Sequence, residues 1–256
     1  MTIGLERLEQ ELYEELDLLE LPADSWLPPQ PDAVLDVAII GAGMAGLAAA
    51  FALMKEGISN IRLFDARPEA FEGSWITYAR MQILRSPKHL AGPALDIPKL
   101  TFQAWYIAQF GQEAWESLYK IPTSQWMDYL RWYRKVLQIP VTNNVKITSV
   151  MPHKGTIELK YADRKIYARK VVLATGRDGF GGFESPSFLK DVPKTYYAHT
   201  IEPIEFDALK DKAITIVGSS ASAFDAAAVA LEAGCASVTQ LSRRKKLAFV
   251  NKFSSL

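Results

Sequence analysis

Residues 34–57 read VLDVAIIGAGMAGLAAAFALMKEG, an apolar run that three glycines interrupt before it resumes with small side chains. Gly41, Gly43 and Gly46 have the G-x-G-x-x-G spacing of a turn between a strand and a helix that binds a dinucleotide. The first glycine permits the tight turn, the second lets a pyrophosphate approach the backbone, and the third lets the helix pack closely on the sheet. The helix start offers free N–H groups to the anion, so Met44 and Ala45 are also predicted contacts.

The flanking sequence agrees with this interpretation. An apolar strand at 37–40 precedes the glycines, and no helix breaker follows them until Gly57. A second strand at 61–64 ends at Asp65, where an acidic side chain would hold the ribose hydroxyls of adenosine. The uncharged residues 37–54 could alternatively form a transmembrane span. Three glycines and many small side chains favour the nucleotide-binding fold.

Composition sets limits on the class of protein. The chain has 256 residues, 49% hydrophobic and 23% charged, and a formal net charge of zero. These values allow a sizeable core and give no electrostatic case for nucleic acid or for an anionic membrane surface. Cys235 is the only cysteine, which excludes a disulfide within these residues and any C-x-x-C pair. We expect a cytoplasmic protein without a signal peptide and without a metal site.

The first 32 residues form a segment of their own. Leucines recur at spacings of three and four between residues 5 and 20, with glutamates between them, which predicts an amphipathic helix. We expect this helix to pack on a domain surface or at a subunit contact of a homo-oligomer. Four prolines between residues 22 and 31 then predict a stiff connector.

A long segment with little periodicity follows Asp65. Loops of this length usually have a function. If the cofactor is a flavin, the segment would run beneath the isoalloxazine ring, and its candidates for contact with the ring or a substrate are Trp75, Arg80, Gln82 and Lys88. The alternative is an irregular packed excursion whose aromatic side chains belong to the core.

The middle of the chain alternates between helical and strand patterns. Helices are predicted at 101–110 and 124–137, the second capped by Ser124. Three short strands at 145–150, 157–161 and 165–168 predict a β-meander, with Val145 as a predicted flavin contact at its start. A further strand at 170–173 would return to the first sheet and bring a turn against the cofactor, consisting of Ala174, Thr175 and Gly176.

The strand–loop–helix–strand pattern repeats at 213–241. The residues of this second loop that we expect to contact a nucleotide are Gly218, Ser219, Ser220, Ala221 and Ser222. Ser220 stands at the position of the second glycine, so a phosphate would approach this backbone less closely. Arg243 and Arg244 follow the second strand, and cationic side chains there favour the 2′-phosphate of NADP over NAD. A solvated basic loop is the alternative.

Taken together, GAGMAG, VVLATG and GSSASAFDAA resemble the motifs of flavoprotein monooxygenases with two dinucleotide-binding domains, which use FAD and NADPH. The resemblance covers roughly residues 34–244. GSW at 73–75 looks like a stretch of flavin-containing and Baeyer–Villiger enzymes, whereas MQILRSPKHL resembles a segment of amine N-hydroxylating enzymes, with a spacing one residue longer. The fingerprint of flavin-containing monooxygenases is poorly matched around His199. The subgroup therefore stays open.

The resemblance implies an α/β, Rossmann-like flavoprotein fold. Its parts would be an N-terminal helix and connector (1–32), an FAD-binding domain with a β-meander (33–200) and a partial NAD(P)-binding domain (201–256). We expect a partial chain, because such enzymes continue beyond this point. The implied reaction uses NADPH and O2 to oxygenate a small molecule at the flavin, so no acid or base is assigned among the side chains. The alternatives are a flavin-dependent reductase that passes electrons to a partner, and a non-catalytic nucleotide-binding module.

Overall fold

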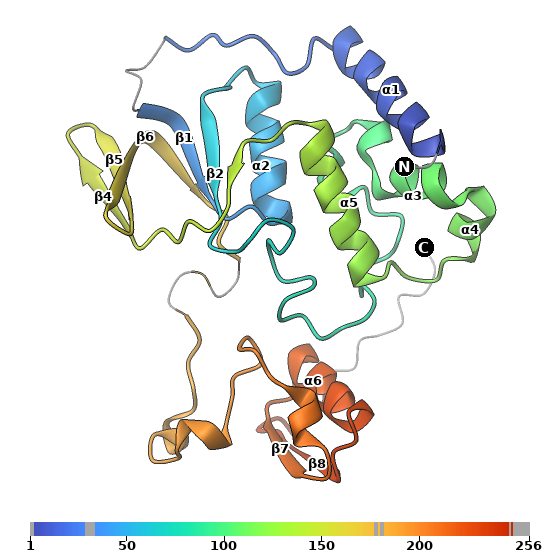
Figure 1. Cartoon of the computed structure of the whole chain (residues 1–256), viewed down its shortest axis with the longest axis vertical. Coiled ribbons are helices and arrows are strands. Elements are labelled where there is room, and N and C mark those ends of the chain that lie inside the picture. The colour runs from blue at the N-terminus through green and yellow to red at the C-terminus, as the bar shows by residue number, and fades with distance from the viewer. Residues whose placement is uncertain (1–2, 29–33, 177–178, 180–181, 246, 248–256) are drawn as a thin grey trace. The chain divides into compact units, whose positions relative to one another are not determined.

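The computed structural model describes residues 3–28, 34–176, 179, 182–245 and 247 (Figure 1). The chain forms two compact units. One contains Met1–Ile76 and Ile83–Gly182, and the other contains Thr77–Gln82 and Phe183–Leu256. Residues 183–200, which the sequence analysis grouped with the first domain, thus cluster with the second unit.

The first unit is built on a six-stranded sheet with the order β3-β2-β1-β6-β5-β4. The strands β3, β2, β1 and β6 are parallel, and β6, β5 and β4 form an antiparallel meander. This arrangement confirms the predicted α/β fold class with a meander. The strands are β1 (Val34–Ile40), β2 (Ile61–Phe64), β3 (Val141–Thr142), β4 (Ser149–His153), β5 (Thr156–Tyr161) and β6 (Arg164–Leu173).

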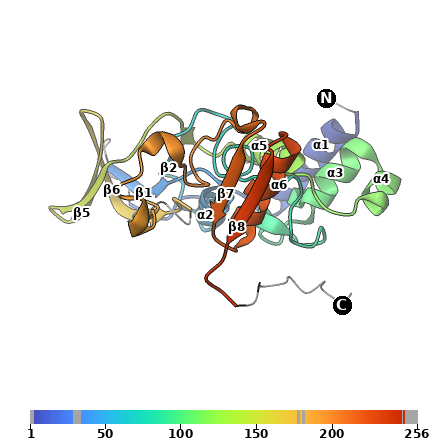
Figure 2. The same ribbon diagram turned by 90° about the horizontal axis from the view of Figure 1, so that it is seen from below.

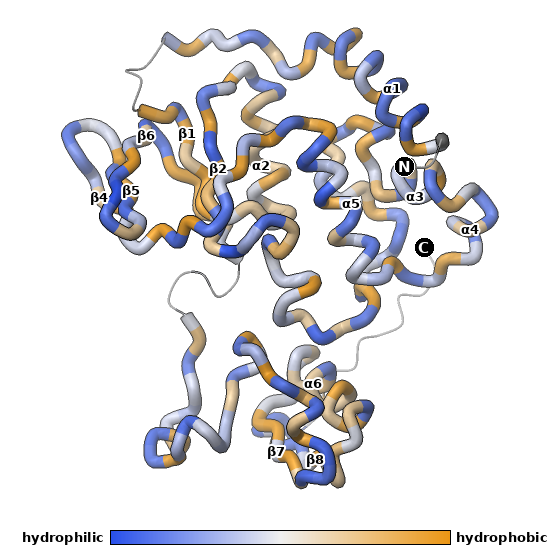
Figure 3. Tube along the Cα trace, viewed as in Figure 1, coloured by the Kyte–Doolittle hydropathy of each residue, from blue (hydrophilic) through white to orange (hydrophobic). Residues whose placement is uncertain are grey.

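Strand β1 is buried because it pairs with β2 on one side and β6 on the other. The helix α2 (Met44–Lys55) follows it and packs against β1, β2 and β6. The hydropathy colouring shows apolar colours along β1 that continue into α2 (Figure 3). Residues 37–54 are therefore a strand and a helix, and none of the described helices has the length and apolarity needed to cross a membrane.

Two strand predictions were wrong. The predicted strands 165–168 and 170–173 are one strand, β6, because no turn residue separates them. Its first part pairs antiparallel with β5 and its later part pairs parallel with β1, with an overlap at Tyr167 and Ala168. The predicted strand 145–150 begins only at Ser149. Val145 precedes it, buried in an apolar cluster with Ala38, Phe64 and Leu159.

Helices cover the rest of the first unit, and their bounds are α1 (Ile3–Leu18), α3 (Phe102–Phe110), α4 (Gln112–Ser117) and α5 (Thr123–Val136). The sequence analysis did not predict α4. Helix α1 packs on α3 and buries Leu5, Leu8, Leu12 and Leu16, as an amphipathic helix should. The predicted cap Ser124 is wrong, because Pro122 is the N-cap of α5 and Ser124 lies inside the helix.

The irregular segment after Asp65 is tied to α5 by two buried tyrosines. The hydroxyl of Tyr129 donates to the carbonyl of Leu100 at 2.6 Å, and that of Tyr133 donates to the carbonyl of Pro93 at 2.7 Å. Burial raises the pKa of both phenols above its usual range, so they remain neutral donors. This part of the segment is packed structure.

The second unit contains a parallel pair of strands, β7 (Ala213–Val217) and β8 (Ser237–Leu241), with the helix α6 (Ala221–Glu232) between them in sequence. All three elements follow the prediction. Helix α6 packs on both strands (Figure 2). The short 3₁₀ helices of the chain are η1 (Gly92–Ala94), η2 (Pro98–Leu100), η3 (Ser187–Leu189), η4 (Lys194–Tyr196) and η5 (Phe206–Leu209).

Candidate dinucleotide-binding site

The turn between β1 and α2 is held by backbone contacts on two sides. The N–H of Gly41 donates to the carbonyl of Phe64 at 2.8 Å, and that of Ala174 donates to the carbonyl of Ile40 at 2.8 Å. Gly41 has a φ of 102°, and a Cβ atom there would collide with the carbonyl of Ala174. The turn after β6 therefore lies directly against the glycine loop.

The start of α2 is suited to an anion. Its N-cap is Gly43, so no side chain caps the first turn, which begins with Met44 and Ala45. A Cβ atom on Gly46 would collide with the carbonyl of Gly41, so this glycine is needed for the helix to approach the loop. A Cβ atom on Gly43 would lie 3.4 Å from the Cα of Gly73, which belongs to the segment that covers the loop.

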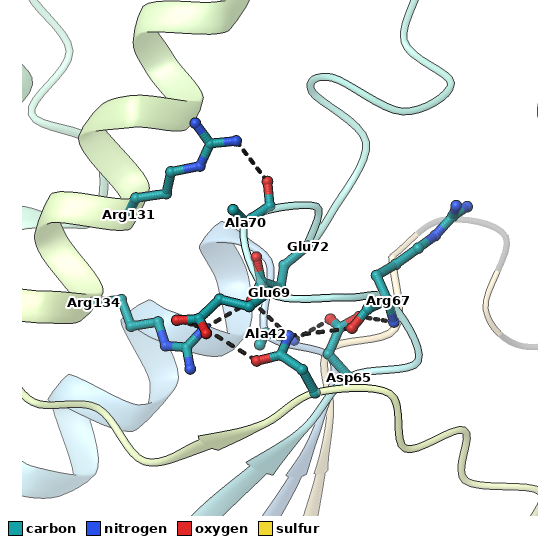
Figure 4. A network of polar contacts seen from close by, with 9 residues as sticks. Ala42, Asp65, Arg67, Glu69, Ala70, Glu72, Arg131 and Arg134 are labelled. Carbon is teal, nitrogen blue, oxygen red and sulfur yellow. Dashed lines mark hydrogen bonds and ion pairs between the residues drawn. The ribbon is translucent and has the colours of Figure 1, made fainter.

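Asp65 lies at the end of β2 and is only 8% exposed. Its Oδ2 accepts the N–H of Ala42 in the loop, and its Oδ1 accepts the N–H of Arg67, both at 2.8 Å (Figure 4). A carboxylate has about four acceptor positions. Asp65 can therefore brace the glycine loop and still accept hydrogen bonds from ribose hydroxyls.

A cavity of about 270 Å³ adjoins the loop. Gly43 and Leu47 line one side of it, and Met127 and Arg131 of α5 line another. The guanidinium of Arg131 bonds Asp128 and the carbonyl of Ala70, both at 2.7 Å, while its Nε is buried and has no hydrogen-bond partner among the described residues. This orphaned donor beside an uncapped helix start fits an anionic group.

A polar cluster that the sequence analysis missed lies at the edge of this cavity. Arg134 Nη1 contacts Glu72 Oε1 at 2.8 Å, and the amide of Asn143 donates to the same oxygen at 2.7 Å. The sequence signal for it is weak, since Arg134 lies far from Glu72 in the chain. In the structure, the burial of Glu72, whose side chain is 6% exposed, distinguishes this pair from an ordinary surface pair, and the sequence does not reveal that burial.

The predicted contacts Trp75, Val145 and Thr175 all lie in the first unit. The Trp75 ring packs edge-on against Trp126, with 6.0 Å between ring centroids. Val145 is buried, and its N–H donates to the carbonyl of Asp65 at 2.8 Å. The hydroxyl oxygen of Thr175 is buried without a hydrogen-bond partner among the described residues, and Gly176 after it has a φ of 78°.

The structure does not gather the four ring or substrate candidates into one unit. Trp75 and Lys88 belong to the first unit, whereas Arg80 and Gln82 belong to the second. Lys88 Nζ donates to the carbonyls of Trp115 at 2.6 Å and Glu116 at 3.2 Å, so its ammonium group is engaged at the end of α4.

Arg80 is held within the second unit. It donates to the carbonyls of Thr77 at 3.2 Å and Glu202 at 3.0 Å, and its guanidinium carbon lies 5.4 Å from the centroid of the Phe206 ring. Burial lowers the pKa of Arg80 from its ordinary value. His199 in the same unit stacks on Phe183, with ring centroids 4.4 Å apart.

The second glycine loop has a similar geometry. The N–H of Gly218 donates to the carbonyl of Leu241 at 2.9 Å, and its φ is 136°. The N-cap of α6 is Ser220, without a side-chain cap, so the first-turn residues Ala221 and Ser222 also face no capping group. Ala223 takes the third glycine position and is buried. The amide of Gln240 donates to the carbonyl of Gly218 at 2.9 Å, a bond that the sequence did not reveal.

Arg243 and Arg244 come after β8, separated from it by Ser242, and are exposed. The N–H of Arg244 donates to the hydroxyl of Ser242 at 3.1 Å, which shapes the turn that presents the two side chains. Among the described residues, no group of three or more His, Cys, Asp or Glu is placed to hold a metal ion.

These features can be compared with known proteins. The family model described as pyridine nucleotide-disulphide oxidoreductase matches residues 38–255. The chain belongs to this family. The family is described as one of oxidoreductases, which is the class of enzyme that the sequence analysis predicts. The chain is 42% identical over 256 residues to an FAD-dependent urate hydroxylase from Xanthomonas campestris pv. campestris, and the match covers 97% of this chain and 54% of that protein. The chain thus spans about half the length of this curated relative.

Two solved structures show the fold more directly. A bacillithiol disulfide reductase from Staphylococcus aureus is 23% identical, with a TM-score of 0.63 over 84% of this chain and 59% of that one. A flavin monooxygenase from Stenotrophomonas maltophilia is 19% identical, with a TM-score of 0.65 over 86% of this chain and 60% of that one. At these identities the likeness shows the fold alone. It confirms the predicted Rossmann-like flavoprotein fold.

Proposed function

We propose that this chain binds FAD through its first unit and NADPH through its second, in a monooxygenase that oxygenates a small molecule. The observation that carries the FAD assignment is the cradle around Gly43. It combines an uncapped helix start, a glycine without a side chain opposite Gly73, and the buried carboxylate of Asp65. Each part matches one part of the ligand, namely the pyrophosphate, its close approach and the adenosine ribose.

The remaining first-unit residues have supporting roles in this proposal. Ala174, Thr175 and Gly176 would line the ligand beside the loop, since the turn packs on Gly41. The buried oxygen of Thr175 and the Nε of Arg131 would find partners on the bound ligand. Trp75 and Val145 would contact the ring and the adenosine ends, respectively. In the second unit, the loop from Gly218 to Ser222 would hold the NADPH pyrophosphate and Arg243 or Arg244 its 2′-phosphate.

Bound FAD would supply the redox chemistry, which consists of accepting hydride equivalents from NADPH and activating O2. The protein would contribute placement and exclusion of water. We propose no acid or base among the side chains. Arg80, Gln82 and Lys88 stay candidates for substrate or ring contact, although the bonds of Lys88 to α4 favour a structural role.

The relative supports a choice of substrates to test. Because a protein 42% identical over nearly the whole chain is a urate hydroxylase, urate and related heteroaromatic compounds are the first substrates to test. A cytoplasmic location and a homo-oligomer remain proposals, the former supported by the single cysteine.

A reductase is the second candidate, because the family name and one structural relative refer to disulfide substrates. Within these 256 residues Cys235 is the only cysteine, and it is buried. In a reductase, electrons from the flavin would therefore not pass through a cysteine pair within these residues.

The test begins with ligand binding to the 256-residue chain. We expect one FAD per chain after reconstitution, and NADPH binding that is tighter than NADH binding. NADPH oxidation is then followed with and without urate, together with peroxide release and hydroxylated product. Failure to bind any flavin would overturn the proposal, and a non-catalytic nucleotide-binding module would then be the remaining alternative. Flavin-dependent NADPH oxidation that responds only to an added disulfide or protein acceptor would favour the reductase.

A further inference from the structure

A short segment covers the glycine loop of the first unit. We call residues 69–73 the cover segment. Its Gly73 lies opposite Gly43, so close that a Cβ on Gly43 would be 3.4 Å from the Gly73 Cα. Glu69, Ala70 and Glu72 line the cavity beside the loop. The position of this segment therefore sets one wall of the space beside Gly43 that a pyrophosphate would enter.

Two arginines of helix α5 hold the cover segment. Arg134 Nη1 bonds Glu72 Oε1 at 2.8 Å, and Arg131 Nη2 bonds the carbonyl of Ala70 at 2.7 Å (Figure 4). The side-chain amide of Asn143 bonds both partners of the contact between Arg134 and Glu72. It donates to Glu72 Oε1 at 2.7 Å and accepts from Arg134 Nη1 at 3.2 Å. The side chains of Glu72 and Arg134 are 6% and 20% exposed, so solvent screens this contact little.

The same cluster reaches Asp65. Asn143 also donates to the carbonyl of Arg67 at 3.2 Å, and the N–H of Arg67 donates to Asp65 at 2.8 Å. Asp65 in turn accepts the N–H of Ala42 in the glycine loop. A continuous set of hydrogen bonds thus connects the glycine loop with the cover segment.

The charges at this place need an explanation. A buried carboxylate beside an anion-binding loop repels a phosphate unless a cation neutralises it. A buried ion pair also stabilises a fold no better than well-packed apolar side chains of similar size. Stability alone therefore does not account for Glu72 and Arg134 at the edge of the loop.

We propose that Glu72, Arg134 and Asn143 are positioning residues that hold the cover segment over Gly43, and thereby set the affinity of the first glycine loop for a dinucleotide pyrophosphate. This inference rests on the proposed binding of FAD by the first unit. It goes further by assigning the affinity to side chains of α5, of the cover segment and of the residue after β3, none of which belongs to the glycine motif.

The test uses the double variant Glu72→Leu with Arg134→Met, which removes both charges together and leaves neither one buried alone. Dissociation constants for FAD and for ADP are measured by titration of the apoprotein, and thermal unfolding of the apoproteins is recorded in parallel. We expect both ligands to bind at least tenfold more weakly while the unfolding midpoint stays near that of the wild type. Glu72→Gln, which keeps an acceptor for Arg134 and Asn143, should bind both ligands within about threefold of the wild type.

A matched control lies at the other end of β1. Asp36 and Arg169 form a pair at 3.1 Å in which the carboxylate side chain is also 6% exposed. Asp36→Leu with Arg169→Met should leave the affinities for FAD and ADP unchanged. Should the Glu72 and Arg134 double variant fail to fold, Asn143→Ala replaces it, because that change removes the shared hydrogen bonds and no charge.

The outcomes separate the two proposals. A wild-type chain that binds neither FAD nor ADP contradicts the proposed function. A wild type that binds both, with unchanged affinities in the double variant or in Asn143→Ala, overturns the positioning role. A loss confined to FAD, with ADP unaffected, also overturns it, because the defect would then lie at the flavin ring and not at the pyrophosphate. Weaker binding of both ligands by Glu72→Gln as well as by the control pair would show a general loss of structure and would equally overturn it.

Discussion

Gly41 and Gly43 are neighbours in one loop, yet they are glycines for different reasons. Gly41 has a positive φ, and any Cβ there collides with Ala174. Gly43 has a φ of −69°, which suits any residue, and a Cβ there would only touch Gly73. The first glycine is thus required by the fold, while the role that we propose for the second is to bring the loop backbone close to the ligand.

This difference gives the first prediction. Gly43→Val should fold with a local shift of Gly73, because its backbone angle is ordinary and its Cβ would lie 3.4 Å from the Gly73 Cα, but should lose FAD, because the γ-methyl groups crowd the place that we propose for the pyrophosphate. Gly41→Ala should instead lower the unfolding midpoint with or without FAD. The measurements are the flavin content of purified protein and the melting temperature of the apoprotein. A Gly43→Val variant that retains one FAD per chain would contradict the loop assignment.

Arg243 and Arg244 give the second prediction. A charge-assisted hydrogen bond contributes about 1.5–3 kcal/mol, which corresponds to roughly tenfold to a hundredfold in affinity. Replacing the arginine that contacts the 2′-phosphate by alanine should therefore weaken NADPH by this factor and leave NADH nearly unchanged. Lys245→Ala serves as the neighbouring control. Equal losses for both nucleotides would mean that the basic cluster is only a solvated loop end.

At the scale of elements, the meander carries a buried charge of its own. Glu158 on β5 is bonded to Lys165 at 2.9 Å and Lys160 at 3.3 Å, and its side chain is 8% exposed. The hydrogen bond from Lys165 lowers the pKa of Glu158 from 4.5 to about 2, even though partial burial opposes the shift. The carboxylate is therefore favoured in the folded meander.

The third prediction follows from the sign of this shift. Because the pKa of Glu158 is lower in the folded than in the unfolded chain, its stabilising contribution is complete above about pH 4.5 and is lost as the pH falls toward 2. Glu158→Gln should thus show a flatter dependence of the unfolding free energy on pH between 4.5 and 2 than the wild type. Urea unfolding at a series of pH values measures this. Parallel curves for the two proteins would show that the pair has no influence.

At the scale of the whole molecule, two compact units divide the proposed ligands between them. A ligand stabilises only the structure that it binds, and at a concentration of 100 times its dissociation constant it adds about 2.7 kcal/mol to the unfolding free energy. Hydrogen exchange can measure this stabilisation separately in each unit.

The fourth prediction is therefore a selective pattern of protection. FAD should slow exchange in β1, α2 and the turn after β6, while NADPH should slow exchange in the loop from Gly218 to Ser222 and at the start of α6. The Gly43→Val variant should lose the first effect and keep the second. Protection of the second glycine loop by FAD alone would reverse our assignment of the ligands.

The sequence by itself determined the two glycine loops, the elements around them and the acidic residue after β2. These are local features, because the need for small side chains, the alternation of strand and helix and the position of Asp65 are all set by neighbours in the chain. The predicted bounds of β2 matched the structure for the same reason.

Only the tertiary structure decided how distant residues combine. The long strand β6 continues where the sequence analysis placed a break. Its first part pairs with β5 and its later part with β1, and the two pairings overlap at Tyr167 and Ala168, so the strand stays extended throughout. Ser124 does not cap α5, because the helix begins after Pro122. The contact of Glu72 with Arg134 and Asn143 joins three regions of the chain, and its strength comes from burial that no local pattern records. The sequence could therefore locate the glycine loop, while the cover above it depended on packing between α5 and a segment without regular structure.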